Sequence, residues 1–406
     1  MYKFKSIHLK NIRYLFLAAI ISSLSFYSCE EQISDLGQNF INPDDTLGTL
    51  LLDSKTDSIT ISVNNFKQYI NSFNSNFMMI GDYQDWEART LLRFTNISSD
   101  YDSATVLSAR IIMKYGDYFF RDSLGSVSFD VLKLNNRKSF NTITNDSINS
   151  GDIDNVVQGT FTGSPVDSAQ ISIDVNTQLA KDWLEYTADT SYSVKNNGVI
   201  MIPNGGNTIK GFFSSSADES LRPSLEIIVT KNSVTDTLVF NQSESVFLSD
   251  APSSVILPDR IYLQSGVAFR SIVNFGLSQL PSNVIINDAL LTLTLDTANS
   301  YLSPVSDQRL VAAMVTDSAA KTDSLGFITL NRVGNEYSIR FILIMQNWNS
   351  GFNPNLGLAL RNLSENSTMD IFSFFGPTYS DTSVVPRLRI RYTLRDSQKI
   401  TREEKR

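Results

Sequence analysis

The amino-acid sequence predicts an all-β protein in which two tandem antiparallel β-sandwich domains follow a signal peptide. Three observations support this fold class: short segments alternate between apolar and polar residues, polar turn clusters separate them, and a set of landmarks recurs in both halves of the chain. Aromatic residues, which favour sheets, make up 11% of the 406 residues. Many short strands with few helices are typical of sandwiches and barrels.

Residues 1–28 have the pattern of a signal peptide. They contain four basic residues and no acidic residue, and an apolar run at 14–21 (YLFLAAII) is followed by small and polar residues up to Ser28. A basic region, a short apolar region and a small residue before the cleavage point are typical of an exported protein. The apolar run is too short to span a bilayer, which disfavours a transmembrane anchor.

Cys29 is the only cysteine of the chain and directly follows this segment. Residues 1–31 resemble a bacterial lipoprotein signal, in which a lipobox ends in cysteine. The resemblance implies cleavage after Ser28, acylation of Cys29 and anchoring in the outer membrane, because several acyl chains hold a protein far more firmly than one. In some Gram-negative lipoproteins, acidic residues such as Glu30 and Glu31 at this place accompany display on the outer face. Both the cell surface and the periplasm stay open, and the alternative to lipidation is an ordinary secretory signal.

Residues 29–50 are mostly polar, and we interpret them as a tether. Predicted strands begin after this tether, and turn clusters such as 203–206 (PNGG) separate them. The clearest alternating segments are 58–63 (SITISV), 126–131 (SVSFDV), 291–295 (LTLTL) and 388–392 (LRIRY). Residues 396–406 form a charged tail, which we expect to be solvated.

The second half of the chain repeats landmarks of the first half. Residues 89–94 (RTLLRF) match 270–275 (RSIVNF), and each match is followed by a polar turn and an apolar segment. Further matches, in the same order, are Trp183 with Trp348, 198–201 (GVIM) with 357–360 (GLAL), and 222–227 (RPSLEI) with 386–390 (PRLRI). The sequence therefore predicts two sandwich repeats, residues 51–232 and 233–395.

These landmarks resemble the DNRLRE family, a jelly-roll-like β-sandwich module of secreted and surface proteins. The similar features are the early Arg-x-Leu-Leu-x-Phe strand, the late tryptophan, the Gly-x-x-x strand and the terminal Pro-x-Leu strand. The resemblance implies a jelly-roll-like fold and a surface location, and some relatives bind polysaccharide.

The composition excludes several kinds of chemistry. The only histidine, His8, lies in the predicted signal, so the mature chain has no histidine and one acylated cysteine. This excludes a Ser-His-Asp triad, a Cys-His pair and zinc held by histidine or cysteine. Cleavage leaves 30 basic and 42 acidic residues, a formal charge of −12. An acidic surface argues against nucleic acid and anionic lipid headgroups as partners.

Trp86 is the best candidate for contact with a ligand. It lies close to Asp82, Tyr83 and Asp85 in the segment GDYQDWE, whereas the second repeat has Val267 at the matching position. Carbohydrate sites combine an aromatic face with carboxylates and amides, because the ring stacks on the sugar while the polar groups bind its hydroxyls. The alternative is an aromatic side chain that folds onto its own sandwich.

Trp183 and Trp348 are instead expected in the core. Apolar residues precede each of them at helical spacing, which predicts a helical turn that plugs one end of each sandwich. Asp174 is the expected cap of the first helix. An aromatic platform for a sugar ring is the alternative for both tryptophans.

Closely spaced aspartates leave a structural calcium site open, although none follows the EF-hand pattern. The pairs are Asp44 with Asp45, Asp82 with Asp85, Asp100 with Asp102, and Asp152 with Asp154. Solvated loop carboxylates are the alternative, and no other cofactor is expected.

The sequence predicts a non-catalytic, lipid-anchored envelope or cell-surface protein that binds glycan or contributes to adhesion. Polysaccharide and other envelope proteins are the expected partners, besides the membrane that holds the lipid anchor. One alternative is a glycosidase or lyase acting on polysaccharide, and a glycosidase needs two opposed carboxylates in a cleft. The other is a structural or assembly subunit of an envelope complex, for which an apolar surface patch would be evidence.

Overall fold

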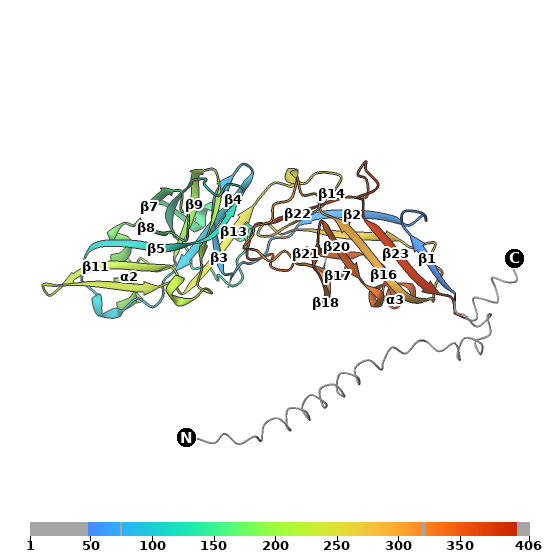
Figure 1. The fold of residues 1–406 in the computed structure, drawn as a ribbon. Helices are drawn as coiled ribbons and strands as arrows, with labels where there is room; N and C mark the ends of the chain where they lie inside the picture. The colour runs from blue at the N-terminus through green and yellow to red at the C-terminus, as the bar shows by residue number, and fades with distance from the viewer. Residues whose placement is uncertain (1–47, 74, 318–321, 396–406) are drawn as a thin grey trace, which may run out of the picture. The chain divides into compact units, whose positions relative to one another are not determined.

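A computed structural model of the protein describes residues 48–73, 75–317 and 322–395. These residues form two antiparallel β-sandwiches, called lobe 1 and lobe 2 here, so the all-β prediction is confirmed (Figure 1). Cys29, the predicted signal peptide, almost all of the tether and the charged tail lie outside the described residues. Within the described part of the chain, no helix has both the length and the apolar character needed to cross a membrane.

Lobe 1 contains one sheet of eleven strands that contributes both layers of the sandwich. The long strand β5 (Thr105–Phe120) joins the layers, because its first part pairs with β8 and β11 and its end pairs with β10. The other strands are β3 (Phe77–Tyr83), β4 (Trp86–Arg93), β6 (Val127–Leu134), β7 (Ile153–Gly163), β8 (Gln170–Asp174), β9 (Val199–Gly206), β10 (Ile209–Phe213), β11 (Ser224–Lys231), β12 (Val234–Asn241) and β13 (Glu244–Asp250).

Lobe 2 contains a five-stranded and a seven-stranded sheet. The smaller sheet has β1 (Thr49–Asp53), β16 (Ile285–Thr294), β19 (Arg332–Val333), β20 (Glu336–Arg340) and β23 (Arg387–Thr393). The larger sheet has β2 (Thr60–Lys67), β14 (Arg260–Gln264), β15 (Phe269–Gly276), β17 (Leu310–Asp317), β18 (Thr322–Leu330), β21 (Leu358–Asn362) and β22 (Ile371–Phe375). The described part of the chain also has five short 3-10 helices in its loops, at Ser99–Tyr101, Asn145–Ser147, Ser150–Asp152, Glu219–Leu221 and Ser253–Val255.

Alternating residues fill the core between the layers of each lobe. In lobe 2, Leu291 and Leu293 of β16 are buried, while Thr292 and Thr294, which alternate with them, are only partly buried. They pack with Ile390 of β23 and with apolar side chains of the larger sheet, such as Phe372. The equivalent core of lobe 1 is built in the same way, so the period-two pattern of the sequence marks the buried faces.

The two lobes repeat the same strand pairings in the same register. Strand β4 pairs with β9 in lobe 1 as β15 pairs with β21 in lobe 2. The matched pairs are Thr90–Met201 with Ser271–Leu360, Leu91–Ile200 with Ile272–Ala359, and Leu92–Val199 with Val273–Leu358. The matching segments 89–94 and 270–275 therefore lie at equivalent places, as the landmarks predict.

A glycine before the partner strand has the same role in both lobes. Gly198 and Gly357 have φ angles of +96° and +95°, in the left-handed region. A Cβ atom would lie 2.5 Å from the carbonyl oxygen of Leu92 at Gly198, and 2.7 Å from that of Val273 at Gly357. Only glycine fits this close approach of two backbones, so each repeat requires it at this landmark.

The first two strands of each repeat pair with the lobe formed mainly by the other repeat. Strands β1 and β2 lie beside β23 and β15 of lobe 2, and the blue β1 and β2 are seen among its orange and red strands in Figure 1. Strands β12 and β13 lie beside β11 and β4 of lobe 1. The lobes therefore differ from the predicted domains 51–232 and 233–395 in these exchanged strands. The landmarks order the strands along the chain, but they do not choose the lobe that each strand joins.

Two α-helices occupy equivalent places, α2 (Thr177–Ala188) against β5 and α3 (Ile342–Asn349) against β16. Trp183 on α2 is fully buried, and Trp348 on α3 is 7% exposed, so both lie in the cores, as expected. The predicted cap of the first helix is wrong. Asn176 caps α2 by accepting a hydrogen bond from the Gln178 amide (2.9 Å), whereas Asp174 is the last residue of β8.

An apolar cluster with members from both lobes lies at their junction. The described residues from Leu50 onward belong to one compact unit. The cluster contains Met79, Trp86, Ala88, Tyr118, Phe120, Ile209, Phe247, Ala251, Tyr262, Val267, Phe269, Met369 and Ile371. Within it, the Tyr118 hydroxyl of lobe 1 donates to Asp370 of lobe 2 (3.1 Å) and accepts from the Met369 amide (2.8 Å). Burial raises the pKa of Asp370 to about 6.

Candidate functional site

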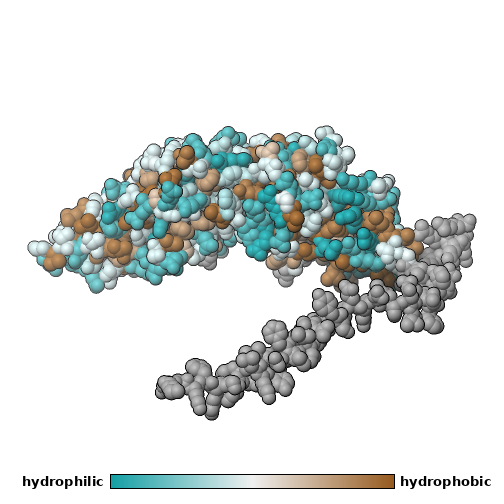
Figure 2. Space-filling view, viewed as in Figure 1, coloured by the Kyte–Doolittle hydropathy of each residue, from teal (hydrophilic) through white to brown (hydrophobic). Residues whose placement is uncertain are grey.

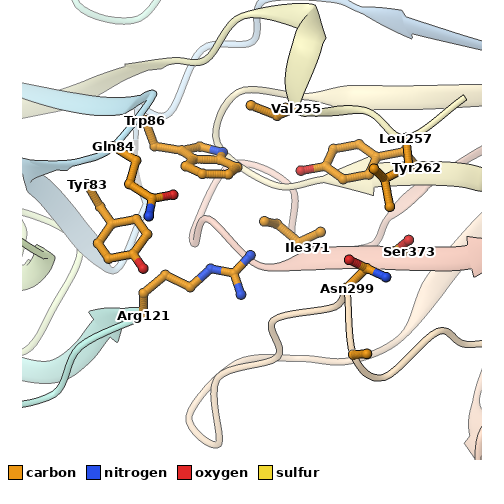
Figure 3. Close-up of a pocket in the computed structure, with 11 residues that line it drawn as sticks. Tyr83, Gln84, Trp86, Arg121, Val255, Leu257, Tyr262, Asn299, Ile371 and Ser373 are labelled. Atoms are coloured by element: carbon orange, nitrogen blue, oxygen red, sulfur yellow. The ribbon is translucent and has the colours of Figure 1, made fainter.

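A cavity of about 300 Å³ lies where the β3–β4 hairpin of lobe 1 meets lobe 2 (Figure 3). Lobe 1 contributes the hairpin and the residue that follows β5, lobe 2 contributes β14, β22 and a loop after β16, and the segment between β13 and β14 contributes Val255 and Leu257. The lining residues are Tyr83, Gln84, Trp86, Arg121, Val255, Leu257, Tyr262, Ala298, Asn299, Ile371 and Ser373. Three aromatic side chains and several polar side chains therefore share one small space.

The geometry of the hairpin decides which predicted residues reach this cavity. Tyr83 pairs with Trp86 across the two strands, and Asp82 pairs with Glu87. Paired residues of a hairpin project from the same face, and the next pair projects from the other face. Tyr83 and Trp86 therefore share the face that lines the cavity. Asp82 lies on the opposite face, and Asp85 is exposed in the turn.

Two of the four predicted ligand contacts, Tyr83 and Trp86, line the cavity, and Asp82 and Asp85 do not. One carboxylate oxygen of Asp82 is buried without a hydrogen-bond partner among the described residues, and burial raises the pKa of this group. The strict alternation of a hairpin, which the sequence motif does not reveal, separates the aromatic residues from the acidic ones.

Trp86 forms a wall of the cavity and is 8% exposed. Its indole Nε1 donates to the Oε1 atom of Gln264 (3.1 Å), and its ring centroid lies 5.5 Å from that of Phe120. The Tyr262 hydroxyl donates to the same Gln264 oxygen (3.2 Å). Because the polar atoms of both aromatic walls are already bonded, these walls offer ring surface to a ligand.

Arg121 supplies a cation to the cavity. In Figure 3 its side chain extends toward the strands of lobe 2. The guanidinium carbon lies 5.3 Å from the ring centroids of Phe120 and Tyr301 and 5.9 Å from that of Trp86. Among the described residues no acidic group forms an ion pair with Arg121. Aromatic rings therefore hold the guanidinium group in place, while its N–H groups stay available to donate hydrogen bonds to a ligand.

Sequence reasoning missed Arg121, Tyr262 and Asn299. Arg121 has a φ angle of +76°, unusual for a residue other than glycine, and it follows the aromatic run at 118–120 (YFF). That run is the one local signal near any of the three. Tyr262 and Asn299 reach the cavity only through the contact between the lobes.

A second cavity of about 530 Å³ adjoins the first, and both are lined by Ala298 and Asn299. In the second cavity the guanidinium carbon of Arg260 lies 4.4 Å from the ring centroid of Tyr379 and 4.9 Å from that of Phe375. The other lining residues are Thr294, Leu295, Asp296, Thr297, Asn335 and Val384.

Asp296 organises the loop between the two cavities. Its carboxylate accepts hydrogen bonds from Arg260 Nε (2.8 Å), from Asn299 Nδ2 (2.7 Å) and from the Ala298 amide (3.2 Å). Burial raises the pKa of Asp296, but the hydrogen bonds from Asn299 and Arg260 outweigh it, and the pKa is lowered overall. The carboxylate therefore stays ionised and neutralises Arg260, in contrast to the unpaired Arg121.

Three aspartates of the other pairs form ion pairs with lysine side chains. Asp102 binds Lys231 (2.7 Å), Asp152 binds Lys138 (2.8 Å) and Asp154 binds Lys133 (3.3 Å). No group of three metal-ligating acidic, histidine or cysteine side chains occurs among the residues that could be searched. Asp44 and Asp45 lie outside the described residues.

An apolar groove of about 470 Å³ lies beside α3, away from the two cavities. Its lining includes Phe327, which is 54% exposed, and Leu343, which is 80% exposed. Figure 2, which has the orientation of Figure 1, shows hydrophobic atoms gathered over this end of lobe 2.

Comparison of the chain with protein-family models, with curated proteins and with solved structures finds no match. The resemblance to DNRLRE modules and to lipoprotein signals therefore stays a proposal, and the site alone supports the function.

Proposed function

We propose that the protein is a lipid-anchored envelope or cell-surface protein that binds glycan and does not catalyse a reaction on it. The observation that carries this proposal is the cavity at the lobe junction, where Tyr83, Trp86 and Tyr262 surround a space that Arg121, Gln84 and Asn299 also line. Aromatic faces stack on the C–H surfaces of sugars, while amide and guanidinium groups donate to sugar hydroxyls.

Two side chains of the hairpin have polar atoms to offer. Neither the Tyr83 hydroxyl nor the Gln84 amide bonds to another described side chain, and both residues line the cavity. Donors and acceptors that no described side chain bonds can exchange water for the hydroxyls of a ligand, so their presence in an aromatic cavity favours a hydroxyl-rich ligand.

The glycosidase alternative has less support at this site. The described residues that line the first cavity include no aspartate or glutamate, so the two opposed carboxylates of a glycosidase have no place there. The assembly alternative is favoured by a different observation, the apolar groove beside α3 with its exposed Phe327 and Leu343.

A glycan array probed with residues 30–406 tests the proposal. We expect binding to a restricted set of glycans, and we expect the double variant Tyr83→Phe, Gln84→Ala to weaken it by about tenfold, since each lost hydrogen bond contributes about 0.5–1.5 kcal/mol. Asp85→Ala is the matched control, because Asp85 lies in the same turn but does not line the cavity. Absence of glycan binding, or an equal loss in the control, would refute the proposal.

The proposed anchor is tested by substitution of Cys29. Cys29→Ala should abolish fatty-acid labelling and release the protein from the membrane fraction, because acyl chains on this residue are the proposed attachment. Unchanged labelling and membrane retention in the variant would contradict the anchor. Protease accessibility on intact cells separates surface display from a periplasmic location.

A further inference from the structure

We propose that the glycan is a chain that occupies both cavities, with one sugar in the cavity at the lobe junction and the following sugars in the cavity around Arg260 and Tyr379. This inference rests on the proposed glycan binding and deepens it. It assigns a second subsite to lobe 2 and makes the ligand an oligosaccharide or polysaccharide segment.

One exposed loop borders both cavities. Ala298 and Asn299 of this loop line each of them, so a chain that passes over the loop would reach both. Their volumes are about 300 Å³ and 530 Å³, and ligand pockets usually measure about 300–1,000 Å³ each. The smaller cavity suits a single sugar, and together they have room for several.

The loop that lines both cavities is held in place by hydrogen bonds. Residues 297–299 are exposed, yet the buried carboxylate of Asp296 holds both the Ala298 amide and the Asn299 side chain. The Ser300 hydroxyl also donates to the Asp296 carbonyl oxygen (2.8 Å). The Asn299 side-chain nitrogen donates to Asp296, so the Oδ1 atom of Asn299 is left as an acceptor beside the two cavities. A loop held in this way keeps one geometry before a ligand binds, which lowers the entropy lost on binding.

The second cavity combines aromatic rings with polar side chains. Tyr379 is partly exposed, and its ring centroid lies 4.6 Å from that of Phe375. Arg260 lies against both rings, and Asp296 and Asp259 neutralise it with ion pairs of 2.8 Å. This cavity therefore offers aromatic surface without a free cation, together with the polar side chains of Thr297 and Asn335. Such a lining fits an uncharged stretch of sugar rings rather than an isolated anion.

Chain-length dependence of binding tests the inference. Full-length protein in detergent is titrated by calorimetry with glucose and cellopentaose, galactose and galactopentaose, and mannose and mannopentaose. We expect one pentasaccharide to bind at least about tenfold more tightly than its monosaccharide, since added contacts in the second cavity contribute free energy. Equal affinity of all monosaccharides and pentasaccharides would overturn the second subsite and leave single-sugar binding intact. Absence of binding by all six would overturn the glycan function itself.

Substitutions locate the effect. Tyr379→Ala should remove the gain for the pentasaccharide and leave monosaccharide binding unchanged, whereas Tyr83→Phe with Gln84→Ala should weaken both. Tyr186→Ala is the matched control, because Tyr186 is a partly buried tyrosine on α2 of lobe 1 and lines neither cavity. If Tyr379→Ala weakens the monosaccharide as much as the pentasaccharide, or if the control behaves like Tyr379→Ala, the assignment is wrong. Thermal melts of each variant confirm that the fold is retained.

Discussion

The equivalent hairpins of the two lobes meet at one junction, but they differ in length and in side chains. In lobe 1, six residues (82–87) separate the paired Gly81 and Ala88, whereas in lobe 2 four residues (265–268) separate the paired Gln264 and Phe269. The longer hairpin places Trp86 beside the cavity, and the shorter one has the fully buried Val267 at the matching position. The cavity thus lies where two otherwise matching copies differ.

A second difference concerns the strand that follows each hairpin. Phe120 of β5 pairs with Ile209 in lobe 1, and Tyr301 pairs with Ile371 at the equivalent place in lobe 2. The ring centroids of Phe120 and Tyr301 lie 5.0 Å apart in an edge-to-face contact. In lobe 1 the strand is continuous up to Phe120, whereas in lobe 2 β16 ends at Thr294 and a loop precedes Tyr301. This interruption supplies the Ala298–Asn299 wall. The strand pairings that both lobes share form the scaffold, and the segments in which the lobes differ form the cavity.

The largest expected effect comes from cutting the chain between the lobes. A fragment of residues 75–251 contains every strand of lobe 1, whereas a fragment of residues 51–232 lacks β12 and β13 and carries β1 and β2 without their partners. Because Val246, Phe247 and Leu248 of β13 are buried, we expect the first fragment to unfold cooperatively on heating and the second to show no cooperative transition by circular dichroism. Cooperative unfolding of the 51–232 fragment alone would contradict the strand exchange.

Next in size are the tryptophans of the two helices. Trp183→Ala and Trp348→Ala should each lower the free energy of unfolding by about 3–5 kcal/mol, because each opens a cavity in a core. Urea unfolding followed by fluorescence measures the loss. Lys181→Ala on the exposed face of α2 is the control and should change stability by about 0.5 kcal/mol or less. A loss of less than about 1 kcal/mol in one lobe would show that the helices are not equivalent plugs.

Trp86→Val gives the longer hairpin the residue of its counterpart, Val267. We expect a loss of stability of about 3 kcal/mol, at the lower end for a buried tryptophan, because one face of the ring already borders a cavity. The variant should also lose glycan binding. Thermal unfolding and array binding measure the two effects, and a change of less than about 1 kcal/mol would show that Trp86 is no structural wall.

The smallest effect concerns Asp370 at the lobe junction. Its pKa is raised to about 6 by burial, so between about pH 4 and pH 6 the folded chain holds a proton that the unfolded chain has released. Stability should therefore fall by roughly 2–3 kcal/mol as the pH rises through this window and should stay level above it with respect to this group. Urea unfolding between pH 4 and pH 8 measures the slope. Asp370→Asn should remove it, and Asp85→Asn should not; an unchanged slope in Asp370→Asn would assign it to other groups.

Much of the fold follows from local patterns. The alternation at 291–295 marks the buried leucines of β16, and the glycine landmarks mark two backbones in close approach. The exchange of strands is not predictable in this way, because β2 and β13 pair with equivalent strands of the two lobes and either could complete either sandwich.

The candidate site shows the same limit. Tyr83 and Trp86 were predictable because an aromatic pair beside polar residues is a local feature of the sequence. The prediction that Asp82 contacts a ligand together with Trp86 is not supported, because neighbouring residues of a hairpin strand point to opposite faces. The face on which Asp82 lies depends on the strand pairing. Arg121 and Asn299 come together only when the lobes pack, so no local pattern near either residue indicates that they share a cavity.

The exchanged strands also bear on the origin of the chain. A protein of one repeat would carry two N-terminal strands that complete either its own sandwich or the sandwich of a second copy. Two copies that traded these strands would form a swapped dimer, and end-to-end fusion of their genes would produce the arrangement of β1, β2, β12 and β13 seen in this chain. In the fused chain the two repeats would no longer need identical sequences to exchange strands. Each repeat would then be free to change at positions that the other repeat does not contact.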